Sequence, residues 1–319
     1  MLLVVWGHLD QLQLQSTFKN EFLGWTSTLC RYYNPFYLAA FFFITGYCSD
    51  FSKTSHEFLK GCVKGLLIPN ICLSIIVGVS EMVFIPDSGK TISLLFENNI
   101  LYGGYWFLMA LLEAKIVCYY VLKIHKIFQA ILIGGLYMVA CLLIIHNQHT
   151  PNYLYWLHTF ILLPFLYMGT LLKKKMEMIM RRYIVIIAFL FYLISCIVFV
   201  GLRGISMPFV NGGFIMISYK SLFIYPLLVL SGTIIVLSIS RWIKKSKILE
   251  FIGQQTLSIY CLHYLLLQFF YSVFGLSFYK ADLLHSIFAT FLMLLSCGSL
   301  YLILYKILDT KYLRFLIGR

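Results

Sequence analysis

Three side chains that can exchange protons lie in or beside long apolar runs, where a polar group is costly and usually has a function. His8 closes the first apolar run, Glu113 lies deep in another, and His263 lies inside a third. Asp10 follows His8 two residues later and could orient its imidazole if the helix ends there. A neutral imidazole can accept the proton of a hydroxyl group as that group attacks. These four residues therefore predict acid–base catalysis inside a membrane.

Each of these side chains also has a structural interpretation, and the sequence leaves both open. His8 could be an interfacial histidine bonded to a neighbouring helix, and His263 could be a packing residue. Glu113 could be a buried partner for Lys115 or for another helix. In a continuous helix, residues two apart point in different directions, which weakens the link between Asp10 and His8.

Aromatic and hydroxyl side chains accompany the candidate catalytic residues. Thr45 and Tyr47 end an aromatic run, and Trp106 precedes the buried carboxyl group by seven residues, on the same side of a helix. Tyr260 precedes His263 by three residues and shares its helix face. We expect Thr45, Tyr47, Trp106 and Tyr260 to line a pocket, although the face of Tyr260 could equally serve packing.

Two lysines mark a candidate anion site. Lys60 and Lys64 stand at the predicted start of segment 65–86. Lysines at a helix start oppose the helix dipole unless an anion binds there, so a phosphate-bearing donor would fit. The alternative is the general excess of basic residues on the cytoplasmic side. The nine cysteines form no C-x-x-C pair, and we expect neither a metal site nor a bound cofactor.

The composition is that of a membrane protein. The chain has 319 residues, of which 61% are hydrophobic and 12% charged, whereas soluble domains are about 45–50% apolar. Apolar runs of about 20 residues recur, and this length is typical of membrane-spanning helices. We predict an all-α, polytopic transmembrane helix bundle of about ten segments in a single domain, 1–319. After a short first segment, the expected spans are 33–50, 65–86, 104–122, 128–146, 153–172, 183–201, 220–240, 254–274 and 284–308.

The basic residues predict the orientation of the chain. If the chain changes sides at each segment, eighteen of the 25 Lys and Arg residues fall in one set of loops and six in the other. Cytoplasmic loops carry this excess. We therefore expect a multi-pass protein of the bacterial cytoplasmic membrane with both termini in the cytoplasm. The net charge is +13. We expect the lipid bilayer to be the partner of this basic protein, and we do not expect it to bind nucleic acid.

The first segment is too short to span. Met1–Gly7 gives a helix of about 10 Å, whereas the hydrocarbon core is about 30 Å thick. We expect the native protein to begin upstream of Met1.

Five motifs in order resemble the acyltransferase-3 family of membrane O-acyltransferases, especially its fucose 4-O-acetylase-like members. The motifs span nearly the whole chain: Val4–His8, Phe41–Tyr47, Lys64–Pro69, Trp106–Leu108 and Phe251–His263.

The resemblance implies transfer of an acyl group, acetyl from acetyl-CoA or another acyl-CoA, to a sugar hydroxyl of a cell-surface polysaccharide or its lipid-linked precursor. It implies that His8 is the essential histidine. Thr45 stands where the family has serine, and Lys64 stands where it has arginine. Lysine keeps the positive charge but cannot bind phosphate in the bidentate way that arginine can. Many members carry an arginine eleven residues before the histidine, a position that this sequence does not contain because only seven residues precede His8.

A second hypothesis is a non-enzymatic transporter or flippase for a polysaccharide intermediate or a small molecule. It explains the polar intramembrane residues without chemistry. It also predicts internal repeats, and we find no convincing repeat in the sequence.

The orientation can be tested on two basic loops, 173–182 and 241–250. Single cysteines placed there, on a background without other reactive thiols, should resist membrane-impermeant thiol reagents in intact cells and react after permeabilisation. Ready labelling in intact cells would reverse the orientation.

Overall fold

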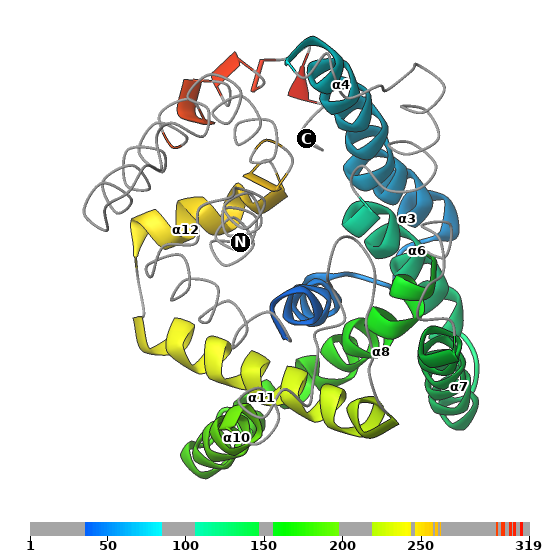
Figure 1. Ribbon diagram of the computed structural model, residues 1–319, viewed down its shortest axis with the longest axis vertical. Helices are drawn as coiled ribbons and strands as arrows, with labels where there is room; N and C mark the ends of the chain where they lie inside the picture. Colours follow the sequence, from blue (N-terminus) through cyan, green and yellow to red (C-terminus); the bar gives the residue numbers. More distant parts are fainter. Residues whose placement is uncertain are drawn as a thin grey trace. The chain divides into compact units, whose positions relative to one another are not determined.

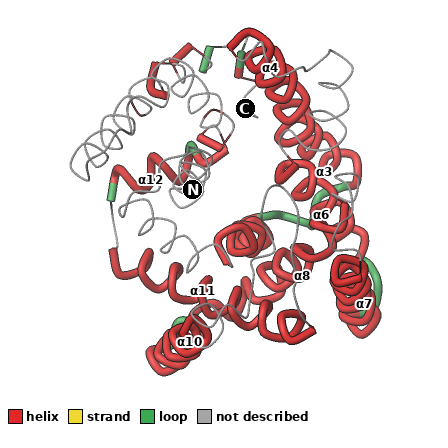
Figure 2. Tube along the Cα trace, viewed as in Figure 1, coloured by secondary structure: helices red, strands yellow, loops and turns green. Residues whose placement is uncertain are grey.

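The structure, a computed structural model, describes most of the chain between residues 36 and 262 and a few later positions. The described residues are 36–84, 106–146, 156–197, 219–243, 246–257, 259–260, 262, 298, 301–303, 306–307, 309–310 and 313–314. Every regular element among them is a helix, which confirms the all-α prediction (Figure 1, Figure 2). They fall into two compact units. The first unit takes its described residues from 63–106 and 246–319, and the second from 31–62 and 107–245.

Four helices in the described part are long and apolar enough to cross a membrane: Ser55–Ile76, Lys126–His146, Trp156–Ile179 and Leu222–Ile243. Phe36–Cys48 and Arg182–Ser195 are shorter apolar helices. The elements are α3 (Ser55–Cys62), the π-turn Val63–Leu67, α4 (Ile68–Phe84), α6 (Trp106–Val121), α7 (Lys126–His146), α8 (Trp156–Leu172), the 3-10 turn Lys173–Lys175, α9 (Met176–Ile179), α10 (Arg182–Ser195), α11 (Tyr219–Ile243) and α12 (Lys247–Gln254).

Most predicted segments within these ranges are confirmed to within a few residues. They are 33–50, 104–122, 128–146, 153–172 and 220–240, and 183–201 begins as predicted. The predicted first segment, the later part of 254–274 and most of 284–308 lie outside the described residues. The count of about ten segments therefore stays a prediction, as does the single domain.

The predicted start of segment 65–86 is wrong, because the helix begins ten residues earlier, at Ser55. Thr54 caps it: its hydroxyl accepts a hydrogen bond from the Glu57 N–H at 3.4 Å and donates one to Glu57 Oε2 at 3.0 Å. This is a form of the capping box, a Ser or Thr followed three residues later by Glu. A polar cap thus starts the helix well before its apolar run.

A separate helix, α12 (Lys247–Gln254), precedes the predicted segment 254–274 and ends where that segment is predicted to begin. The Ser246 hydroxyl accepts from the Leu249 N–H at 3.4 Å and so caps this helix. Here again a capping serine, rather than the onset of hydrophobicity, sets the helix boundary.

Helix α8 forms the core of the second unit. Ile161, Leu162, Leu163, Phe165 and Leu166 are all fully buried. The helix packs along α7, and the Phe165 ring meets the edge of the Tyr225 ring of α11 at 5.7 Å. Burial on all sides explains why α8 is apolar around its whole circumference.

The helix Phe36–Cys48 crosses α8 with the two backbones in direct contact. A Cβ atom on Gly46 would overlap the carbonyl oxygen of Leu166, and one on Gly169 would overlap that of Phe43. The Thr170 hydroxyl also donates to the Gly46 carbonyl at 3.3 Å. Small residues permit such close crossings in membranes, where helices associate by van der Waals packing and hydrogen bonds.

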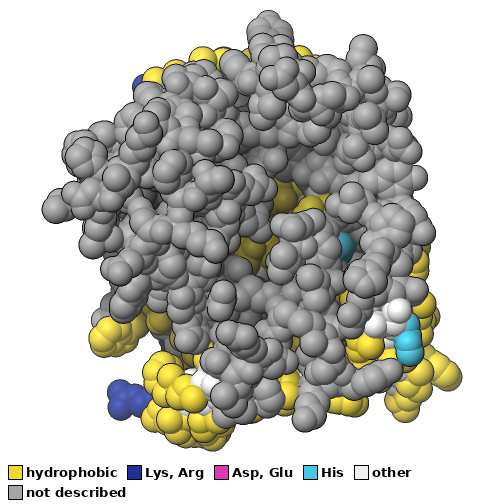
Figure 3. Space-filling model, viewed as in Figure 1, with side chains coloured by type: hydrophobic (Ala, Val, Ile, Leu, Met, Phe, Trp, Pro, Cys, Tyr) yellow, Lys and Arg dark blue, Asp and Glu magenta, His cyan; other side chains and the backbone are white. Residues whose placement is uncertain are grey.

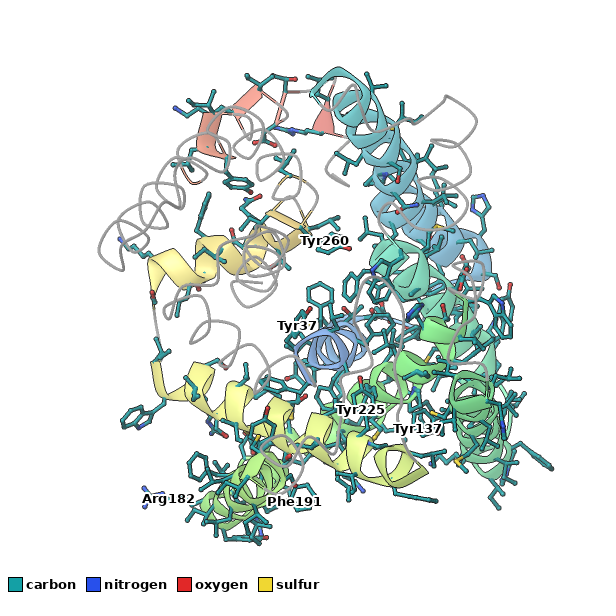
Figure 4. The ribbon with its side chains drawn as sticks, viewed as in Figure 1. Tyr37, Tyr137, Arg182, Phe191, Tyr225 and Tyr260 are labelled. Carbon is teal, nitrogen blue, oxygen red and sulfur yellow. The ribbon has the colours of Figure 1, made fainter. Side chains whose placement is uncertain are left out.

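Side-chain hydrogen bonds join the other helices of the second unit. The Tyr137 hydroxyl of α7 donates to the Leu222 carbonyl of α11 at 2.9 Å, and Figure 4 shows Tyr137 and Tyr225 between these helices. Gln129 of α7 donates to the Ile124 carbonyl in the α6–α7 turn at 2.7 Å and accepts from the Tyr167 hydroxyl of α8 at 2.9 Å. A single amide side chain thus links the turn to the core helix.

Helices α7 and α10 each expose a broad apolar face. Ile127, Phe128 and Ile131 of α7 are 63–64% exposed, and Ile187 of α10 is 63% exposed. Figure 3 shows mainly hydrophobic described side chains at the margin of the view. An apolar surface of this extent fits lipid contact rather than water contact. The composition and these helices identify a membrane protein.

The glycine crossing predicts a strong effect of one methyl group. Gly46→Ala and Gly169→Ala should each destabilise the protein by about 1–3 kcal/mol, the usual cost of overpacking, because the obstructing atoms are backbone. Thermal unfolding in detergent measures the effect. Gly134→Ala on α7 is the matched control, since its Cβ would meet nothing within 4 Å. Equal melting temperatures for all three variants would contradict the crossing.

Candidate functional site

Three of the four predicted catalytic residues, His8, Asp10 and His263, lie outside the described residues. Their roles stay predictions. The fourth, Glu113, lies in the second unit.

Glu113 is hydrogen-bonded to a neighbouring helix. The Thr159 hydroxyl of α8 donates to Glu113 Oε2 of α6 at 2.6 Å. Thr159 is 1% exposed, and the Glu113 side chain is partly buried. A carboxyl group within an apolar bundle is thus held by a neutral donor, an arrangement that favours a functional role for it.

The alternative that Glu113 pairs with Lys115 is wrong. The two are separated by two positions on α6 and point in different directions. The Lys115 ammonium group lies instead over the Phe58 ring, 5.9 Å from its centroid. The contact with another helix, which the sequence also allowed, is the one observed. No sequence signal singled out Thr159, because its partner lies 46 residues away.

The predicted pocket residues are divided between the two units. Thr45 and Tyr47 lie in the second unit, both half-buried, on either side of the tightly packed Gly46. Trp106, half-buried, and Tyr260, 9% exposed, belong to the first unit. The Thr256 hydroxyl, on the predicted face of Tyr260, donates to the Ile252 carbonyl of the preceding helix α12 at 3.1 Å. That these residues line one pocket stays a prediction.

Lys60 and Lys64 are exposed, but they do not stand at a helix start. They lie within the continuous helical segment Ser55–Ile76, so the argument from the helix dipole is wrong for them. Lys64 lies in the π-turn Val63–Leu67. Pro69, two residues after this turn, lacks the N–H that would donate to the Gly65 carbonyl, and this missing bond accounts for the change from α-helical to π-helical hydrogen bonding. Single π-turns of this kind are frequent at functional sites.

Three loops predicted to share one side of the membrane meet at one end of the second unit. Lys173 Nζ donates to the Ser49 carbonyl at 3.4 Å, and the Tyr119 hydroxyl donates to the Lys53 carbonyl at 2.9 Å. Hydrogen bonds from the Ser52 hydroxyl and N–H, with nearby Lys53 and Lys173, hold the pKa of Asp50 below its usual value. This end is therefore rich in positive charge.

The bond between Thr159 and Glu113 can be tested by removing its donor. Thr159→Val should destabilise the protein by about 1–3 kcal/mol, because the carboxyl group loses its partner in the bundle. Thr159→Ser should stay near wild type in thermal unfolding.

Thr233→Val on α11 is the matched control for this test. Thr233 is also 1% exposed, but its hydroxyl donates to the Val229 carbonyl of its own helix. The bond to Glu113 would be refuted if valine cost no more at position 159 than at position 233.

Comparison with known proteins identifies the family. The family model of the acyltransferase domain of acyltransferase-3 proteins matches residues 1–302. Searches of curated proteins and of solved structures find no match. The match covers most of the chain, including all five motifs from Val4–His8 to Phe251–His263, and agrees with its apolar helices. The chain therefore belongs to the acyltransferase-3 family and is a membrane acyltransferase.

Proposed function

We propose that the protein is an O-acetyltransferase of the cell membrane. It transfers an acyl group from cytoplasmic acetyl-CoA, or another acyl-CoA, to a sugar hydroxyl of a cell-surface polysaccharide or its lipid-linked precursor. The observation that carries this proposal is the acyltransferase-domain match over residues 1–302. The transporter hypothesis has no comparable support among these observations.

In the proposed orientation, the acyl donor and the sugar acceptor reach the protein from opposite sides of the membrane. The chain crosses several times with both termini in the cytoplasm, so the lysine-rich end of the second unit faces the acyl-CoA pool. The meeting of loops 49–54, 122–125 and 173–175 at one end supports this arrangement, since all three belong to the same basic set. Residue 8 then lies toward the outer half of its segment, on the side of the acceptor.

In the proposed chemistry, His8 is the general base. Its neutral imidazole accepts the proton of the sugar hydroxyl as that oxygen attacks the thioester carbonyl. The carbon–sulfur bond breaks, and CoA leaves as the thiolate and takes up a proton. A route through an acyl-histidine would divide the transfer into two such steps.

Glu113 can support this chemistry from within the bundle. With Thr159 occupying only Oε2, its carboxyl group has further accepting capacity toward sugar hydroxyls. We assign it to binding or orienting the acceptor. His263 and Asp10 are further candidates for orienting His8 or the acceptor.

Replacement of His8 tests the function. His8→Ala should lower acyl transfer by roughly 10²–10⁴, the usual contribution of a general base, in folded and membrane-inserted protein. The assay follows CoA release from acetyl-CoA by purified protein in nanodiscs, with and without a glycan acceptor. His146→Ala, an exposed histidine at the end of α7, is the matched control. Wild-type transfer by folded His8→Ala would assign His8 to structure.

Glycan mass analysis identifies the acceptor. Cells that lack the gene should lose an acetyl mass from a surface glycan, and wild-type gene but not His8→Ala should restore it. An unchanged glycan profile would argue against a polysaccharide acceptor.

A further inference from the structure

A stacked pair of aromatic rings joins α3 to α6 in the second unit, and the two helices lie close together (Figure 1). The Phe58 and Tyr119 rings are nearly parallel, at 14°, with centroids 4.3 Å apart. Both side chains are buried, at 5% and 2% exposure. We call Ser55, Phe58, Lys115, Tyr119 and Lys123 the α3–α6 seam.

The spacing of the α6 residues places two lysines on either side of the stacked rings. Lys115, Tyr119 and Lys123 follow one another at intervals of four, which places them along one side of the helix and its final turn. Lys115 Nζ lies 5.9 Å from the Phe58 centroid, and Lys123 Nζ lies 4.1 Å from the Tyr119 centroid. Aromatic faces attract cations, so each ammonium group is held against its own ring of the stacked pair.

Hydroxyl groups complete the polar side of the seam. Lys123 Nζ donates to Ser55 Oγ at 3.3 Å, and Ser55 Oγ lies 3.2 Å from the Tyr119 hydroxyl. The neighbouring Tyr120 ring is 48% exposed, and Lys123 Nζ lies 5.4 Å from its centroid. The seam thus presents cations and hydroxyls, and the exposed ring of Tyr120 lies beside it.

The nearby carboxylates do not neutralise these lysines. Asp50 accepts from the Ser52 hydroxyl at 2.6 Å, and Glu57 accepts from the Thr54 hydroxyl at 3.0 Å. Within the described residues, neither Lys115 nor Lys123 forms an ion pair, and the ion pair found there joins Arg314 and Asp309. Each ammonium group has three donors, so the seam has spare donors and unbalanced positive charge.

We propose that the α3–α6 seam binds the phosphates of the CoA donor. This inference rests on the proposed function and locates the binding site of its acyl donor. Lys115 and Lys123 would contact phosphate oxygens, Ser55 would add a hydroxyl, and Tyr120 offers a face for the base. Lys60 lies on the same helix, α3, and stays a candidate contact for the donor.

An anionic lipid headgroup offers the same phosphate chemistry, but the seam favours the nucleotide. Its rings are buried between two helices instead of facing outward, unlike the apolar faces of α7 and α10. The exposed Tyr120 ring suits a base, and a lipid headgroup has no aromatic group to stack there.

Binding of CoA to the full-length protein in nanodiscs tests the proposal. Lys123→Gln and Lys115→Met should each weaken CoA binding by about tenfold, the effect of one lost charge-assisted contact. Lys123→Arg, which keeps the charge, should retain most of the affinity. Lys126→Gln is the matched control, since Lys126 is an exposed lysine at the start of α7 outside the seam. Gel filtration and melting temperature verify that each variant is folded.

The lipid composition separates the two phosphate sources. In phosphatidylcholine nanodiscs the loss in affinity should persist, and added phosphatidylglycerol should change it little. If the loss appears only with phosphatidylglycerol, the seam binds lipid headgroups and the donor assignment is overturned. Wild-type CoA affinity in folded Lys123→Gln and Lys115→Met would also overturn it.

The test also separates failure of the seam from failure of the proposed function. Normal acetyl transfer together with unchanged CoA affinity in the seam variants refutes the assignment of the CoA site to the seam, but not the proposed function. Seam-dependent CoA binding without transfer to any glycan refutes the sugar-acylating function and leaves the donor site standing.

Discussion

The backbone contact between the helix Phe36–Cys48 and α8 is the constraint on which the second unit depends. In lipid, apolar side chains gain little by leaving their surroundings for one another, so helices associate through close packing and hydrogen bonds. Gly46 and Gly169 remove the two Cβ atoms that would hold the helices apart. Gly232 of α11 does the same for the Phe36 ring, so a third helix reaches this pair. The motif Phe41–Tyr47 therefore has a packing role at its glycine.

Several serine and threonine hydroxyls of the second unit bond to a carbonyl of their own helix. Ser231, Thr233 and Thr170 each donate to a carbonyl one turn back on their own helix. Thr159 differs, because its hydroxyl reaches a carboxyl group on another helix. In a low-dielectric interior an unsatisfied carboxyl group is costly. The bond from Thr159 therefore offsets part of the cost of placing the Glu113 carboxyl group in the bundle.

The sequence predicts the apolar helices well and their polar extensions poorly. Runs such as 128–146 and 153–172 are long enough to span a membrane, and hydrophobicity alone finds them. The start of α3 was missed because a capping box, rather than apolar residues, determines it. Its signal, Thr54 followed by Glu57, was present in the sequence.

Tertiary contacts were beyond prediction for a different reason. The partner of Glu113 depends on which helix packs against α6, and hydrophobic periodicity does not specify that. The four-residue spacing of Lys115, Tyr119 and Lys123 is visible in the sequence, but the Phe58 ring that meets them comes from a helix predicted to begin too late. His8 and His263 themselves lie outside the described part, so their roles rest on the sequence and the family.

Pro164 gives α8 two mechanically different halves. The proline lacks the N–H that would donate to the Phe160 carbonyl, so the helix bends more easily there. Beyond it, the glycine crossing prevents sliding, because any shear would drive Cα and carbonyl atoms into one another. Thr159 and its bond to Glu113 lie on the other side of the proline. A bend at Pro164 would therefore move the carboxyl group and its threonine relative to the half of α8 that the glycine crossing fixes.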